Sequence, residues 1–98
     1  MKIQELQPLL EMTASLRSNP STIEVFLYVK DSIESANTPS MAQSACDAIA
    51  TMCHPKAWGD LNVQNFGAAW SDWFDFLEKL EALAIACGKA IYENHAKQ

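Results

Sequence analysis

The sequence predicts an all-α fold, a small helical bundle of four to five helices in which three shorter helices pack on one long C-terminal helix. Apolar residues that alternate at spacings of three and four along the last third of the chain predict this long helix, because that spacing buries one seam of a helix. Proline-containing stop and start signals divide the preceding residues into three shorter segments. We call the apolar positions of the long helix the apolar seam: Val63, Phe66, Trp70, Trp73, Leu77, Leu80, Ala84, Cys87 and Ile91.

The first helix is expected from Gln4 or Gln7 to Arg17. Pro8 has no amide proton and is tolerated in an opening turn, so either the helix starts late or Ile3 to Gln7 forms a separate lead-in. One face carries the apolar residues together with a threonine: Ile3, Leu6, Leu9, Leu10, Thr13 and Leu16.

The second segment, Ile23 to Val29, has the β-branched and aromatic composition of a strand. We predict a helix that continues to Ala36, because a lone strand would have no second strand to pair with. Asn19, which precedes a proline, and the pair Ser21 and Glu24 are both typical of helix N-termini. Since the segment is apolar almost all round, we expect it to be the most buried of the shorter helices.

The third helix is expected from about Pro39 to Cys53, after the cap-and-proline signal Asn37-Thr38-Pro39 and before His54-Pro55. A loop through Trp58 then leads into the long helix. The inward face is predicted to carry mainly small side chains, which permit close approach of a neighbouring helix: Met41, Ala42, Ala45, Cys46, Ile49, Met52 and Cys53.

The long helix is expected from Asp60 to His95. At about 1.5 Å per residue it would be roughly 50 Å long, whereas a globule of 98 residues is only about 30 to 35 Å across. Either the helix breaks near Gly67 to Asp72, or it runs on and a second copy of the chain covers apolar residues such as Leu83 and Ile85. We favour the second outcome, a homodimer.

Composition limits the class of protein. A chain of 98 residues is expected to form one domain over residues 1–98, and 49% hydrophobic with 19% charged residues is typical of a globular protein. The net charge of −5 and a single arginine argue against direct nucleic-acid binding. There is no membrane-spanning run or secretory signal, and three cysteines, an odd number with no Cys-x-x-Cys pair, fit a reducing compartment, so we expect a cytoplasmic protein.

No motif for catalysis or cofactor binding is present: the sequence has no phosphate-binding glycine loop, nucleophile elbow or His-Glu-x-x-His pattern. We therefore predict no enzyme, no catalytic residue, no cofactor and no metal site. A zinc site from Cys46, Cys53, His54 and Cys87 is disfavoured, because the first two lie about 10 Å apart along one helix. The cysteines are expected to be small buried hydrophobes. A protonated His54 is expected to interact favourably with the negative C-terminal end of the third helix dipole. His95 is expected to do the same on its own helix, or to lie in a frayed last turn.

Two features suggest a binding surface. Asp72, Asp75 and Glu78 step by three along one helix face, and the 22 residues from Ala57 to Glu78 include four acids and no lysine or arginine. Such a face is either a solvated surface that keeps the protein soluble or a patch that attracts the basic surface of a partner. Aromatic residues are concentrated beside it, and tryptophan commonly anchors interfaces, although Trp58 could equally plug the end of the bundle. The candidate partner-binding residues are Trp58, Asp72, Asp75, Phe76 and Glu78.

The sequence thus favours a non-enzymatic protein-protein interaction module, a small acidic inhibitor or adaptor that binds a basic surface of a larger protein partner. No motif identifies a family. By general type alone, toxin immunity proteins and phage-encoded inhibitors share this small, acidic, helical profile, which is an analogy. The alternative is a small-ligand-binding or metal-binding bundle that uses a cavity between the third helix and the seam from Trp70 to Cys87.

Overall fold

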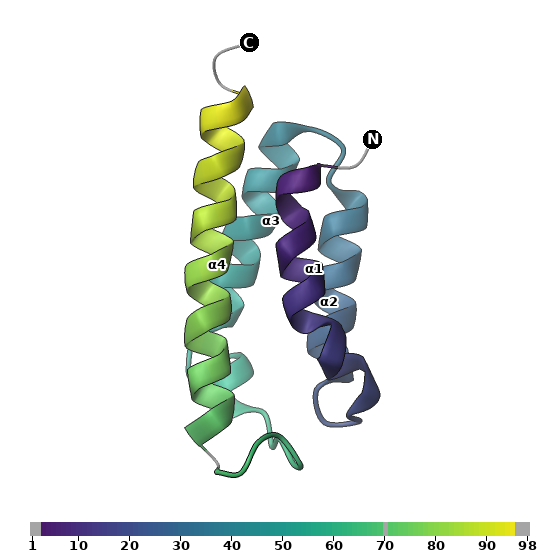
Figure 1. Ribbon diagram of the computed structural model, residues 1–98, viewed down its shortest axis with the longest axis vertical. Helices are drawn as coiled ribbons and strands as arrows, with labels where there is room; N and C mark the ends of the chain where they lie inside the picture. The colour runs from purple at the N-terminus through teal and green to yellow at the C-terminus, as the bar shows by residue number, and fades with distance from the viewer. Residues whose placement is uncertain (1–2, 70, 96–98) are drawn as a thin grey trace.

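The computed structural model describes residues 3–69 and 71–95, and over these residues the chain is helical with no strand. Figure 1 shows a bundle in which α4 runs the length of the molecule, and α4 packs most extensively against α3. The predicted all-α bundle with a long C-terminal helix is confirmed. The α-helices are α1 (Gln7–Thr13), α2 (Ile23–Ser35), α3 (Pro39–Met52) and α4 (Ser71–His95).

Helix α1 is extended at both ends by 3-10 turns, η1 (Gln4–Leu6) and η2 (Ala14–Ser18), so helical backbone covers the predicted segment. Pro8 lies in the first turn of α1, where its missing N–H costs no hydrogen bond. The Thr13 hydroxyl donates to the Leu9 carbonyl at 2.8 Å, which allows this polar side chain to be fully buried. The predicted inward face therefore forms part of the core.

Helix α2 confirms the choice of helix over strand. Asn19 Oδ1 accepts the Ser21 N–H at 2.9 Å and the Asn19 carbonyl accepts the Ile23 N–H at 2.9 Å, so Asn19 caps the turn that leads into α2, as expected. The capping box expected from Ser21 and Glu24 does not form, because the Ser21 hydroxyl donates to Asn19 Oδ1 and accepts from the Gln64 N–H. Nor is α2 the most buried of the shorter helices, since three of its 13 residues are buried, compared with four of 14 in α3.

Helix α3 begins as predicted: the Thr38 hydroxyl accepts a hydrogen bond from the Met41 N–H at 3.1 Å, and Pro39 occupies the first position. Ala42, Cys46 and Ile49 are buried on its inner face. Met41, predicted to point inward, is 45% exposed. It precedes Cys46 by five residues, which places it about 140° round the helix from that buried side chain.

Helix α4 begins at Ser71, so the predicted continuous helix from Asp60 is wrong and the break lies at the predicted alternative site. A 3-10 turn, η3 (Trp58–Asp60), is followed by irregular backbone over 61–69, where Asn65 and Gly67 adopt φ angles of 59° and 72°. Left-handed backbone at these two positions is incompatible with a helix. The 25 residues of α4 span about 38 Å, which fits the 45 Å long axis of the molecule.

The predicted burial of the apolar seam is confirmed for the seam residues that lie in α4. Val63 and Phe66 also pack against this core, although they lie in the irregular segment, and Trp70 lies outside the described residues. Among the described residues no buried side-chain nitrogen or oxygen lacks a hydrogen bond. The seam residues of α4 that are buried are Trp73, Leu77, Leu80, Ala84, Cys87 and Ile91.

Candidate functional site

Trp58, the first candidate partner-binding residue, is buried at 6% exposure at the start of η3. Its backbone carbonyl accepts a hydrogen bond from the Trp73 indole N–H at 2.9 Å, and the Tyr28 ring meets its ring edge-on at 5.4 Å between centroids. These contacts make Trp58 part of the core. The side chain is enclosed within the protomer, so little of it is open to a partner.

Asp72 acts within the chain. Its Oδ2 accepts hydrogen bonds from the backbone N–H groups of Ala68 and Ala69 at 2.7 and 3.0 Å. A Cβ at Gly67 would collide with the same carboxylate, so both the positive φ of Gly67 and its lack of a side chain are needed for this contact. Asp72 therefore links the irregular segment to the first turn of α4 by hydrogen bonds.

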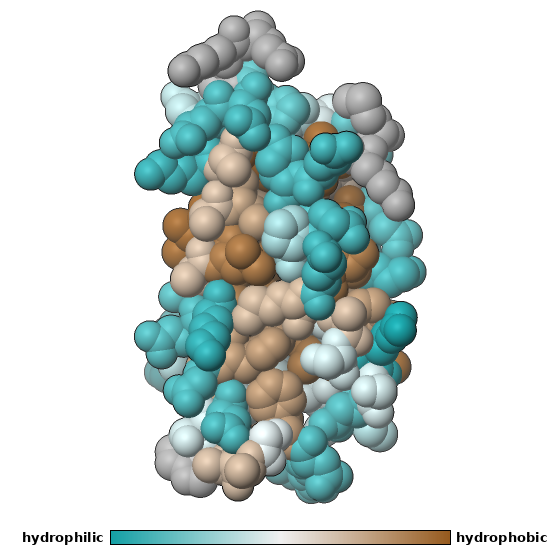
Figure 2. Space-filling model, viewed as in Figure 1, coloured by the Kyte–Doolittle hydropathy of each residue, from teal (hydrophilic) through white to brown (hydrophobic). Residues whose placement is uncertain are grey.

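Phe76 and Leu83 of α4 are both half-buried against the core. The Phe76 ring stacks on Trp73 at 5.6 Å and meets Phe66 edge-on at 5.3 Å between centroids. Figure 2 shows apolar side chains gathered between α4 and α1 on this face. Both residues thus contribute mainly to packing within the protomer.

Asp75 and Glu78 remain on the exposed side of α4, where with Lys79 and Ala82 they line a shallow depression of about 400 Å³. Phe74, which is not among the predicted binding residues, is 38% exposed beside them. One sequence signal for it existed: Phe74 directly follows Trp73 of the seam, so on a regular helix it must point about 100° away from the core.

Phe74 and Glu78 also line a groove of about 260 Å³ between the start of α4 and the end of α3. Pro55 and Glu81 also line the groove, and an added Cβ at Gly59 would stand 3.4 Å from Phe74 Cε1. We call Phe74, Asp75 and Glu78 the acidic docking surface.

Ile85 lies farther along α4 and is 60% exposed, and Tyr92, two turns later, is 62% exposed. The two residues are on the flank opposite Leu83, so the two candidate dimer-contact residues, Leu83 and Ile85, do not share a surface. Ile85 keeps the exposure that a contact with a second copy would need.

The three cysteines are buried, as small hydrophobes would be. Burial raises the pKa of Cys46 and of Cys53 to about 12 and also raises the pKa of Cys87. Within the described residues no group of three or more His, Cys, Asp and Glu side chains is arranged to hold a metal ion. His54 is exposed after α3, where its Nδ1 accepts a hydrogen bond from the Lys56 N–H at 3.1 Å.

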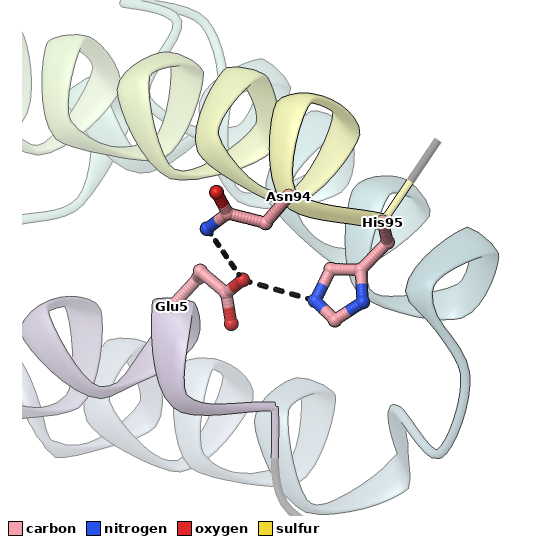
Figure 3. Close-up of polar contacts among 3 residues, drawn as sticks. All are labelled: Glu5, Asn94 and His95. Carbon is pink, nitrogen blue, oxygen red and sulfur yellow. Dashed lines mark hydrogen bonds and ion pairs between the residues drawn. The ribbon is translucent and has the colours of Figure 1, made fainter. Parts of the chain in front are cut away.

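A contact that the sequence did not indicate joins the two ends of the chain (Figure 3). The Glu5 carboxylate in η1 accepts a hydrogen bond from Asn94 at 3.0 Å and lies 3.0 Å from His95 Nε2. The Asn94 hydrogen bond, above all, lowers the pKa of Glu5. The roles expected for His95 are local to its own helix, whereas a partner 90 residues away leaves no local signal in a sequence.

A second long-range contact joins the turn after η2 to the irregular segment. The Asn19 amide donates to the Gln64 carbonyl at 2.7 Å, and the Ser21 hydroxyl accepts from the Gln64 N–H at 3.0 Å. A polar hollow of about 370 Å³ lies beside this junction, with Ser15, Asn65 and Phe66 among its lining residues. These hydrogen bonds fix the irregular backbone without secondary structure.

Comparison of the chain with protein-family models, curated proteins and solved structures found no match. No helix over the described residues is both long enough and apolar enough to cross a membrane.

Proposed function

We propose that this protein is a non-enzymatic protein-protein interaction module, an inhibitor or adaptor that binds a basic segment of a larger protein. The observation that carries the proposal is the acidic docking surface, where an aromatic ring that is 38% exposed stands beside two exposed carboxylates over an open groove. An apolar contact surrounded by charge is the usual anatomy of a transient interface.

The charges favour a basic partner. Asp75 and Glu78 are one turn apart on α4, and the net charge of the chain is −5, so a lysine or arginine side chain would be attracted both at long range and at contact. Because both carboxylates are exposed, they contribute more to the association rate and to salt sensitivity than to affinity. Phe74 would supply the apolar contact that holds the partner after the encounter.

We also propose that the protein acts as a homodimer. Ile85, one of the two dimer-contact candidates, is 60% exposed on a helix whose opposite side forms the core. Leu83 does not support the proposal, since it packs within the protomer.

Selection from a library of random displayed peptides tests the basic-partner proposal and requires no identified partner. Peptides enriched on the wild-type protein should combine lysine or arginine with at least one large apolar residue, and their binding should weaken as salt rises. The double reversal Asp75→Lys and Glu78→Lys should weaken them about tenfold or more, since two attractions become two repulsions.

The matched control reverses two equivalent exposed acids on another helix, Glu24→Lys with Asp31→Lys on α2. It changes the net charge of the protein by the same amount and should leave binding within about twofold. Enriched peptides without basic residues, or equal losses in the two double variants, would contradict the proposed surface, because net charge alone would then explain the attraction.

A further inference from the structure

The C-terminal half of α4 exposes a stripe that is complementary to itself. Ile85 and Tyr92 are the most exposed large hydrophobic residues over the described chain, at 60% and 62%. They are seven residues apart and so lie on one face. Glu81 precedes Ile85 by four residues and Lys89 follows it by four, so one acid and one base lie at equal distances on either side of the isoleucine.

We infer that a second copy of the chain packs on this stripe, with the two α4 helices antiparallel and Ile85 at the two-fold axis. In such a pair the residue n positions before Ile85 faces the residue n positions after it in the other copy. Glu81 of each copy then meets Lys89 of the other. Glu78 meets Tyr92 of the other copy, whose hydroxyl can donate to the carboxylate.

The charges select the antiparallel direction. In a parallel pair Glu81 would meet Glu81 and Lys89 would meet Lys89, which places like charges opposite each other. Neither residue forms an ion pair with another residue of the described chain, so an intermolecular pair would break none there. Two reciprocal ion pairs therefore fit a second copy better than an unrelated apolar segment.

The shape of the stripe also suits a close approach. Ala82, three residues before Ile85, is exposed. Its short side chain leaves room beside Ile85 for the isoleucine of the other copy. A contact confined to one pair of helices is smaller than a standard stable interface of about 1,200 Å² or more, so we expect a weak, concentration-dependent dimer.

This arrangement rests on the proposed homodimer and names its contact and register. Its charged pair lies beyond Asp75 and Glu78, so the basic-partner proposal can fail independently. Sedimentation velocity over a wide concentration range, at low salt, should show monomer and dimer in exchange. Glu81→Lys and Lys89→Glu should each raise the dimer Kd about tenfold, and the double variant should restore it, because the swapped charges attract again.

Two controls match these variants. Glu24→Lys reverses an exposed acid on α2, and Lys79→Glu reverses an exposed base about 120° round α4 from Ile85. Both should dimerise like wild type. Circular dichroism of each variant should be unchanged, since every substituted side chain is exposed.

Cross-linking locates the axis. Oxidation with diamide should link Ile85→Cys to itself in the dimer, since a residue at the axis is its own neighbour. Tyr92→Cys should not link, because its two copies would be about 21 Å apart along the helices. A monomer at all concentrations would overturn the homodimer and this arrangement together. A dimer that ignores the charge reversals, or that links through Tyr92→Cys and not Ile85→Cys, would overturn the arrangement alone.

Discussion

The Asp72 carboxylate holds the entry to α4 by accepting two backbone N–H hydrogen bonds from the preceding loop. We predict that Asp72→Ala lowers the free energy of unfolding by about 1 to 2 kcal/mol, because both donors lose a charged acceptor. Urea unfolding followed by circular dichroism measures the change. Asp75→Ala, which removes an exposed carboxylate one turn later, should change it by less than about 0.5 kcal/mol. Equal effects of the two substitutions would show that the loop does not depend on Asp72.

Glu5 gives stability a pH dependence of known sign. Its folded-state pKa lies below the ordinary value of 4.5, chiefly because Asn94 donates to the ionised carboxylate. The stabilisation is therefore complete above about pH 4.5 and is lost as the pH falls through the lower folded-state pKa. Glu5→Gln should remove this part of the acid sensitivity.

Urea midpoints measured between about pH 6 and pH 3 test this prediction, with Glu11→Gln, an exposed acid on α1, as control. The difference in urea midpoint between wild type and Glu5→Gln should become smaller as the pH falls. A difference that stays constant over this range would mean that ionisation of Glu5 contributes nothing to the stability.

At the scale of the helix, α3 packs extensively on α4, and all three thiols are buried. Cys46 lies against Gly88, where an added Cβ would stand 3.4 Å from the Cys46 Cβ. With a pKa of about 12 for Cys46 and Cys53, the thiolate fraction at pH 8 is on the order of 10⁻⁴. We predict that Ellman's reagent labels none of the thiols of the folded protein within minutes at pH 8.

In 6 M guanidinium chloride, about the concentration that unfolds most proteins, all three thiols should react at once. Rapid labelling of one thiol in the native protein would contradict the burial of the three cysteines. A reactive native thiol would also compete with the thiol of Ile85→Cys in the cross-linking experiment.

Local signals in the sequence predicted the helices better than the connections. Thr38 with Pro39 marked the start of α3, and the seam from Trp73 to Ile91 marked the buried side of α4. The start of α4 was misplaced because Val63 and Phe66 continue the helical spacing and do reach the core, but from irregular backbone. Spacing reports which residues are buried, and it cannot report the backbone conformation that brings them there.

The candidate site was predictable in part for the same reason. Asp75 and Glu78 were placed on the exposed face of α4 by helical geometry alone, whereas the internal role of Asp72 depends on the turn at Gly67. The contact of Glu5 with His95 joins residues at opposite ends of the sequence. Such contacts follow from the packing of whole helices and leave no pattern in any short segment.

For the molecule as a whole, α4 has two sides with different tasks. Its inner side forms the core with the other helices, and its outer side carries the acidic docking surface near the start and the Ile85 stripe near the end. We propose that the first surface receives a basic segment and the second a copy of the same chain. Glu78 belongs to both, because it faces Tyr92 of the other copy in the proposed dimer, whereas Asp75→Lys alters the first surface alone and Lys89→Glu the second alone.

The proposed function depends above all on the binding of a basic, partly apolar segment at the start of α4. Backbone amide NMR spectra recorded while a selected basic peptide is added locate that binding residue by residue. We predict that the largest shift changes map to Phe74, Asp75, Glu78 and the adjoining Pro55 groove, and that they vanish in the double reversal Asp75→Lys and Glu78→Lys. Changes centred on the polar hollow beside Asn19, or no saturable changes anywhere, would contradict the proposal.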